Sequence, residues 1–264
     1  MTTASADAVP VYWQETRRPW VNLVFIAPWL VLYELGVWLS DRAGQAARNG
    51  ADEWLRTALD RTGWPMAWVL PLLVVATLWG WHRAVQQPCE VRRDTLAGMA
   101  AESLLFACGL ILIGQAVDGW MRVSDPLLLS TGTTSIALRL VNFLGAGLYE
   151  EYLFRLCLIP LSYVLLRGIL VPHRFAVACS IVATSVVFAL AHYLTPTIDG
   201  NVMSLFSDAV VRVQSQRELW FGFAFRLIAG GYFAAVYCTR GFGIAVGCHA
   251  LYDVIVGIVL ISEL

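Results

Sequence analysis

The sequence predicts an all-α protein, a polytopic transmembrane bundle with seven or eight spans. Hydrophobic residues make up 58% of the 264 residues, whereas charged residues make up only 14%. The mean hydropathy is +0.66. Soluble domains usually contain about 25% charged residues, so this composition indicates an integral membrane protein.

Seven apolar runs each approach the roughly 20 residues that a helix needs to cross a bilayer. The runs are 20–39, 65–81, 95–117, 135–160, 175–194, 219–238 and 242–261. A further apolar stretch, 161–170, follows Pro160. It is either a short eighth crossing or the rest of a long helix kinked at that proline.

The rest of the chain suggests no separate soluble domain. Residues 1–19 form a polar N-terminal tail, and residues 20–264 are expected to form a single integral-membrane domain. The connection 41–63 has apolar residues at helical spacing, which predicts an amphipathic helix on the membrane surface. The connection 195–218 is expected to be a loop, either a plain connector or a segment that contacts substrate.

Charge and cysteine content exclude several classes of protein. The net charge is -1 and basic residues form no run, so nucleic acid is not an expected partner. The six cysteines are scattered and form no CxxC pair, which argues against a disulfide framework or a zinc knuckle. The arginines are nearly balanced between alternate connections, so the orientation in the membrane is not predicted.

Ionisable side chains interrupt three of the apolar runs. They are Glu150, Glu151 and Arg155 in the run 135–160, His192 in the run 175–194, and His249 and Asp253 in the run 242–261. A charged side chain at the bilayer centre costs about 2.5–3.5 kcal/mol on insertion scales, so it is normally kept for pairing, a wet cavity or chemistry. The motif-bearing core, at about 135–264, is therefore expected to assemble one polar site inside the bundle.

Three pairs of residues in these runs are four apart in sequence. They are Glu151 and Arg155, Phe188 and His192, and His249 and Asp253. On an α-helix each pair projects from one face, because residues four apart are neighbours. Three facing helices would then bring a carboxylate and two imidazoles together.

Glu150 is turned about 100° away from Glu151 on an α-helix. If Arg155 neutralises Glu151, then Glu150 faces the cavity and suits a general base that acts on water. His192 and His249 are then expected to approach the Glu150 carboxylate directly or through one water molecule. No serine or cysteine has a paired base at a convincing spacing, so an acyl-enzyme is not expected.

The motif residues resemble those of a known family. Residues 150–155 read EEYLFR, an EExxxR pattern; residues 188–192 read FALAH, and residues 249–253 read HALYD. In this order, on apolar runs, the three motifs resemble the CAAX protease and bacteriocin-processing (CPBP, Abi) family of intramembrane endopeptidases. The resemblance covers about residues 140–256. It implies hydrolysis of a peptide bond by glutamate-activated water; eukaryotic members remove three residues from prenylated CAAX proteins.

The resemblance also implies roles for the motif residues. Glu150 would activate water, His192 and His249 would complete the catalytic site, and Asp253 would stabilise the oxyanion. The site would be supported structurally by Glu151, Arg155 and Phe188.

Asp253 departs from the family pattern, in which asparagine is commoner. Asparagine donates a hydrogen bond at any pH, whereas aspartate donates only when protonated. Asp253 could instead orient His249 or help to bind a divalent metal such as zinc. The ligands of such a metal would be Glu150, His192, His249 and Asp253.

Two other functions are weighed beside the peptidase. A catalytically silent immunity or scaffold protein would not need Glu150, His192 and His249 together. A proton- or metal-coupled transporter is disfavoured because no inverted repeat is visible. The expected partners are membrane lipids and a peptide or protein substrate, lipidated or not, and the expected location is the cytoplasmic membrane of a prokaryote.

Overall fold

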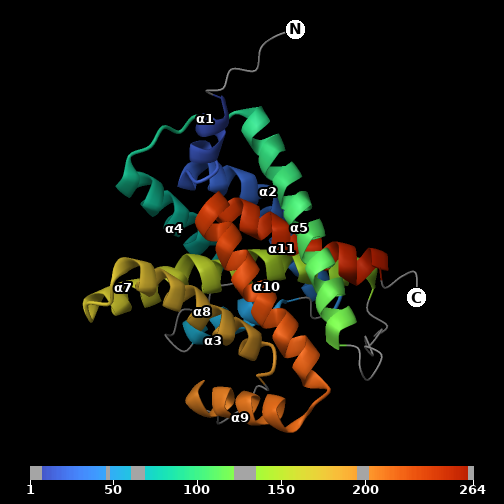
Figure 1. Ribbon diagram of the computed structural model, residues 1–264. Helices are drawn as coiled ribbons and strands as arrows, with labels where there is room; N and C mark the ends of the chain where they lie inside the picture. Colours follow the sequence, from blue (N-terminus) through green and yellow to red (C-terminus); the bar gives the residue numbers. More distant parts are fainter. Residues whose placement is uncertain (1–7, 46–47, 61–68, 122–134, 195–201, 261–264) are drawn as a thin grey trace. The chain divides into compact units, whose positions relative to one another are not determined.

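The computed structural model describes residues 8–45, 48–60, 69–121, 135–194 and 202–260, and helices joined by short connections make up most of these ranges (Figure 1). The elements in order are α1 (Ala8–Glu15), α2 (Pro19–Arg42), α3 (Gly50–Asp60), α4 (Val69–Val85), α5 (Arg93–Met121), α6 (Ile136–Gly145), η1 (Ala146–Glu150), η2 (Tyr152–Leu158), α7 (Ile159–Gly168), α8 (His173–Ala191), α9 (Val202–Ser215), α10 (Leu219–Arg240), α11 (Phe242–Val254) and η3 (Ile255–Leu260). The elements labelled η are π-helices. These ranges contain no strand, which confirms the predicted all-α class.

Several of the helices are suited to a bilayer. By length and composition, α2, α5, α8 and α10 could each cross a membrane, and α4 and the segment Phe242–Ile258 are shorter apolar helices. Many large apolar side chains, such as Leu105 and Leu112, are exposed on the surface of these helices. In water such exposure would be unfavourable, so the chain is an integral membrane protein.

A continuous helical segment carries the first motif. Residues 136–168 are helical without a break, through α6, η1, η2 and α7. The stretch 161–170 is therefore mostly the continuation of a long helix past Pro160, which lies in the first turn of α7. Of the two alternatives that the sequence left open, the structure shows the long helix.

Two helices connect the apolar ones. Helix α3 confirms the amphipathic helix predicted in the connection 41–63. The loop predicted over 195–218 is wrong where α9 forms; residues 195–201 lie outside the described residues. Leu205, Ala209 and Val213 recur every four residues, which is the helical period, and Ala209 and Val213 are buried against Tyr193.

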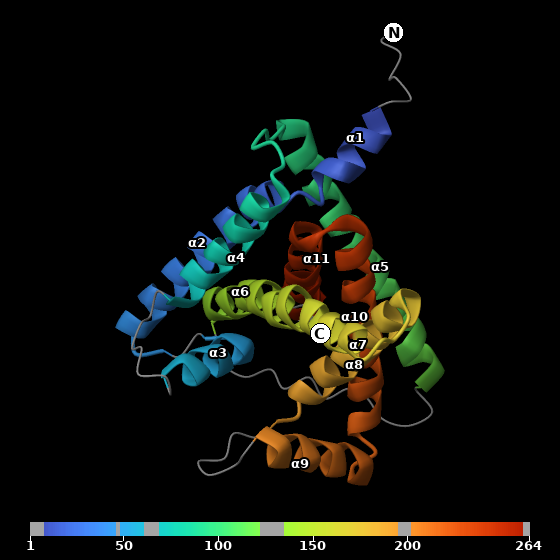
Figure 2. The same cartoon turned by 90° about the vertical axis from the view of Figure 1, so that its left-hand side faces the viewer.

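The chain divides into two compact units. The first comprises Met1–Cys108, Thr131–Leu153 and Val236–Leu264, and the second comprises Gly109–Ser130 and Phe154–Ala235. Within the first unit, α2 packs against α4, α6 and α11, and α11 packs against η1 (Figure 2). Within the second unit, α8 packs against α7 and α9. Residues 8–15 of the predicted polar tail form α1, and the single membrane domain stays a prediction.

Glycines allow α11 to pack closely in the first unit. Gly241, the residue before α11, has a φ of 108°, a conformation that side chains rarely adopt. A Cβ atom at Gly243 would lie 2.9 Å from the side chains of Asn22 and Met99, and one at Gly247 would lie 2.5 Å from Ser103 Oγ. These contacts with α2 and α5 place α11 at a fixed depth, and thereby position His249.

Candidate active site

The two glutamates of the first motif lie where π-helical turns interrupt the α-helix that the sequence predicts. Glu150 is the last residue of η1, and Glu151 stands between η1 and η2. In a π-helix the backbone bonds run from residue i to i+5, and such turns occur often at functional sites. Spacing based on 3.6 residues per turn therefore does not apply here. Glu150 is 8% exposed and Glu151 is fully buried.

Helices η1 and α11 approach each other closely beside these glutamates. A Cβ atom at Gly147 would lie 2.6 Å from Ala250 Cβ and 2.7 Å from the Ala250 backbone nitrogen. Real Cβ atoms essentially never come within 3.0 Å of another heavy atom, so only glycine allows this approach. Because His249 precedes Ala250 on α11, the contact brings the imidazole to the two carboxylates.

The imidazole of His249 is held by Glu151. The His249 Nδ1 atom lies 2.8 Å from Glu151 Oε1. An ionised carboxylate only accepts hydrogen bonds, so Nδ1 carries the proton in this contact. The other ring nitrogen, Nε2, lies 4.0 Å from Glu150 Oε2 and 3.6 Å from Asp253 Oδ2. Four of the predicted site residues are therefore together in the first unit.

Glu150 also contacts a residue that the sequence analysis missed. Asn49 Nδ2 donates a hydrogen bond to Glu150 Oε1 at 3.2 Å. Asn49 directly precedes α3, and its Oδ1 accepts a bond from the Ala51 amide at 2.8 Å. An asparagine before an amphipathic helix is a typical N-cap, but no local pattern links it to Glu150, which is 101 residues away.

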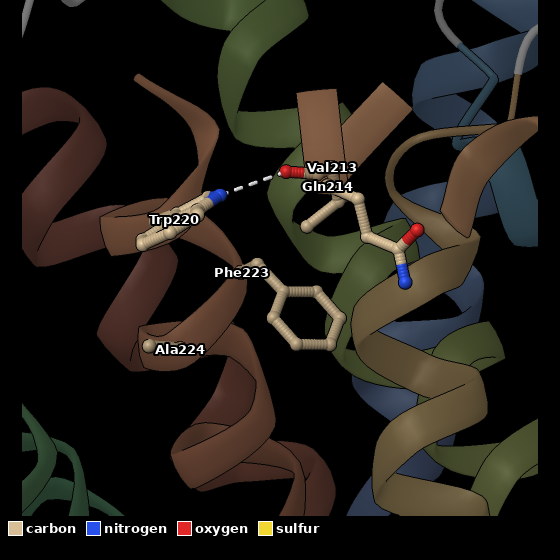
Figure 3. Close-up of a pocket in the computed structure, with 5 residues that line it drawn as sticks. All are labelled: Val213, Gln214, Trp220, Phe223 and Ala224. Atoms are coloured by element: carbon tan, nitrogen blue, oxygen red, sulfur yellow. Dashed lines mark hydrogen bonds between the residues drawn. The ribbon is translucent and has the colours of Figure 1, made fainter. Parts of the chain in front are cut away.

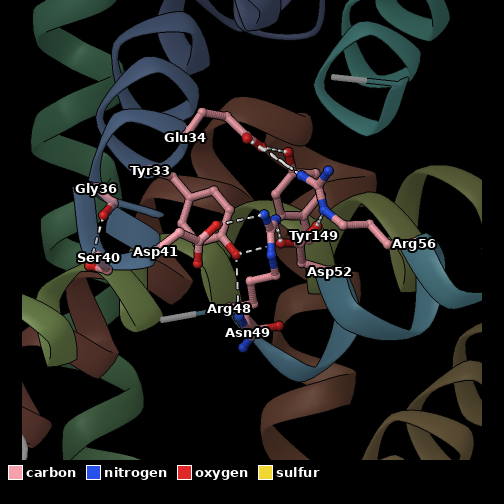
Figure 4. Close-up of polar contacts among 10 residues, drawn as sticks. All are labelled: Tyr33, Glu34, Gly36, Ser40, Asp41, Arg48, Asn49, Asp52, Arg56 and Tyr149. Atoms are coloured by element: carbon pink, nitrogen blue, oxygen red, sulfur yellow. Dashed lines mark hydrogen bonds and ion pairs between the residues drawn. The ribbon is translucent and has the colours of Figure 1, made fainter. Parts of the chain in front are cut away.

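A buried polar network attaches α3 to α2 and η1 (Figure 4). Asp52 is fully buried; it accepts bonds from Tyr33 Oη at 2.8 Å and from Arg56 Nε at 2.5 Å. Arg56 also pairs with Glu34 at 3.2 Å, and the Tyr149 hydroxyl donates to Glu34. Burial lowers the pKa of Arg56, but the carboxylates of Asp52 and Glu34 raise it above its usual value.

The second motif lies in the second unit. His192 is the C-cap residue of α8, and its Nδ1 lies 2.9 Å from the Phe188 carbonyl oxygen. The two rings are 4.9 Å apart at 68°. A carbonyl only accepts, so Nδ1 carries the proton and Nε2 holds the lone pair when the ring is neutral. Phe188 thus orients His192 from both its backbone and its ring.

Arg155 is buried in the same unit among aromatic rings. It is 1% exposed and donates from Nη2 to the Gly230 carbonyl at 3.1 Å. Its guanidinium carbon lies 4.4 Å from the Phe188 ring centroid and 5.4 Å from that of Phe233. Contacts between a cation and ring faces stabilise a buried guanidinium. Its pairing with Glu151, and the approach of His192 to Glu150, stay predictions.

Two further features of the described residues concern metal binding and open space. In the ranges that the structure covers, no group of three or more His, Cys, Asp or Glu side chains is placed to hold a metal ion. A hollow at α9 and α10 in the second unit is lined by Val213, Gln214, Trp220, Phe223 and Ala224 (Figure 3). None of these five side chains is ionisable, so the hollow by itself offers no acid or base.

The long apolar helices define a helical integral membrane protein, and its first unit buries a cluster of Glu and His side chains. The family model described as type II CAAX prenyl endopeptidase Rce1-like matches residues 132–255. This match covers just under half of the chain, and it confirms the resemblance to the CAAX protease family that the three motifs indicated. No curated protein and no solved structure matches the chain.

Proposed function

We propose that this protein is an intramembrane endopeptidase in which Glu150 activates the attacking water. The observation that supports this most is the setting of the Glu150 carboxylate, which is buried between Asn49 Nδ2 at 3.2 Å and His249 Nε2 at 4.0 Å. A general base must lie within hydrogen-bond distance of the proton that it removes, either directly or through one water molecule. The 4.0 Å separation from Nε2 suits a contact that tightens on substrate binding.

The reaction would proceed by direct attack of water. Glu150 takes one proton as the water oxygen adds to the scissile carbonyl, and the tetrahedral intermediate carries an oxyanion. When the C–N bond breaks, the same proton passes to the leaving nitrogen, so Glu150 returns to its ionised state. General base catalysis of this kind typically contributes about 10²–10⁴-fold.

His249 and His192 would assist from fixed orientations. Glu151 fixes the tautomer and angle of the His249 ring, so its Nε2 would serve the intermediate or the leaving group. His192 is included because of its motif, and its ring is oriented by Phe188. Asp253, 3.6 Å from His249 Nε2, would either donate to the oxyanion when protonated or orient His249.

The substrate is proposed as a peptide or protein segment presented at the membrane, with or without a prenyl group. The Rce1-like match supports a CAAX-type peptide as the first one to test. Residence in the cytoplasmic membrane of a prokaryote is also part of the proposal and is supported only by the sequence resemblance.

A proteoliposome assay tests the proposal. Purified protein is reconstituted and given fluorescent peptides that end in a CAAX sequence, farnesylated and unmodified, while ion flux is recorded in the same vesicles. The expected result is release of the C-terminal tripeptide without ion flux. Peptide binding without cleavage would instead identify a silent scaffold or immunity protein, and proton or metal flux without cleavage would identify a transporter.

A further inference from the structure

The side chain of Asn49 has a defined orientation between α3 and Glu150. Its Oδ1 accepts from the Ala51 amide at 2.8 Å, and its Nδ2 donates to Glu150 Oε1 at 3.2 Å. A backbone N–H can only donate, so a flipped amide would place two donors against each other. The capping bond at Ala51 therefore requires that the NH₂ group points to Glu150.

The backbone of Asn49 is held as firmly as its side chain. Its amide donates to Tyr33 Oη at 3.2 Å, and the same hydroxyl donates to Asp52 Oδ2 at 2.8 Å. Asn49 is 6% exposed. A buried residue that is bonded at its backbone amide, its Oδ1 and its Nδ2 has little rotamer freedom, so its donor is already in place before substrate binds.

Helix α3 supplies a rigid base for this donor. Asp52, in the first turn of α3, bonds to Arg56 at 2.5 Å and to Arg48 at 3.3 Å (Figure 4). Helix α3 packs against η1, the element that ends at Glu150. Because α3 lies outside residues 132–255, the family match does not cover it.

We infer that Asn49 is a positioning residue that holds Glu150 Oε1, so that Oε2 is directed toward His249 Nε2. This inference rests on the proposed function, since it assigns Asn49 a part in the same reaction. A carboxylate with one oxygen bound by an amide cannot rotate freely, so a single oxygen is presented to the water. Helix α3 is then a component of the active site.

Two substitutions of Asn49 test its hydrogen bond to Glu150 separately from its capping of α3. In Asn49→Ser the hydroxyl still caps α3, because serine is as good an N-cap as asparagine, but it is too short to reach Glu150. We expect kcat to fall about 10- to 100-fold, the range for a hydrogen bond to a charged group, with KM within about twofold. Asn49→Asp also keeps the cap but sets a carboxylate against Glu150, and we expect a larger loss of kcat.

Gly50→Ala is the matched control. Gly50 is the next residue, is exposed, and has no atom within 4 Å of an added Cβ. We expect it to keep wild-type kcat. An Asn49→Ser protein with wild-type kcat, or one whose defect lies only in KM, would overturn the inference.

A stability cycle tests the contact without any activity. Asn49→Ser should lower the melting temperature more in the wild-type background than in a Glu150→Ala background, because the bond exists only in the former. Equal decreases would overturn the inference. If no peptide is cleaved at all, the proposed function fails, while the cycle still decides whether Asn49 holds Glu150.

Discussion

Replacing Gly147 with alanine should separate η1 from α11 at the point where the glutamates meet His249. The added Cβ would lie 2.6 Å from Ala250 Cβ and 2.7 Å from the Ala250 backbone nitrogen. Carbon atoms are best placed about 3.5–4.0 Å apart, so the helices must move apart by about 1 Å. Backbone atoms of a packed helix cannot turn aside as a flexible side chain can.

Two effects follow from that movement. Overpacking typically costs about 1–3 kcal/mol, and the better helix propensity of alanine offsets about 0.5–1 kcal/mol of it. The net loss of stability should therefore be modest, about 0–2.5 kcal/mol. A misplacement of about 1 Å in an active site can cost about 10²-fold in rate, so activity should fall much more than stability.

The assay is peptide cleavage in proteoliposomes together with thermal unfolding in detergent. Gly80→Ala is the control, because Gly80 lies within α4 and has no atom within 4 Å of an added Cβ. It should leave cleavage near wild type and keep the melting temperature at or slightly above the wild-type value, because alanine is the better helix former. A Gly147→Ala protein with kcat within about threefold of wild type would refute the idea that this close approach positions the site.

Three further predictions concern other motif residues. Arg155→Ala should lower the melting temperature, and the free energy of unfolding should fall by roughly 3–5 kcal/mol if the arginine also pairs with Glu151. A stable but inactive variant would move Arg155 into the catalytic site. If Asp253 donates to the oxyanion, Asp253→Ala should lower turnover roughly 10²–10³-fold, whereas Asp253→Asn should stay active. An inactive Asp253→Asn protein would exclude the donor role. Inhibition of the wild-type protein by a chelator would favour a metal. His192→Ala should abolish cleavage with little change in melting temperature, and normal turnover would remove His192 from the site.

The overall class could be predicted from the sequence because it depends on composition and on local periodicity. Apolar runs near 20 residues became helices, and the amphipathic pattern around Trp54 and Leu55 became α3. The same periodicity is present in α9, but that segment is less apolar than the runs beside it, so its composition indicates a loop. The π-helical turns around Glu150 and Glu151 had no such signal, since no local residue pattern distinguishes them from α-helix.

The partners of isolated charges could not be predicted because they are long-range. Glu34, in α2, pairs with Arg56 of α3, 22 residues away. Glu102 pairs with Arg240, 138 residues away, at 2.6 Å. The contact between Asn49 and Glu150 is of the same kind. Such pairs depend on how the helices pack against one another. The spacing of residues along a single helix does not predict that packing.

The turnover of purified Glu150→Gln protein tests the central claim most directly. Glutamine has nearly the same shape, and its amide oxygen can still accept the bond from Asn49, so the protein should insert and melt as wild type does. It cannot take a proton from water, so cleavage should fall by about 10²–10⁴-fold, the usual contribution of a general base. Near-normal turnover by a correctly folded Glu150→Gln protein would contradict the role of Glu150 as the base.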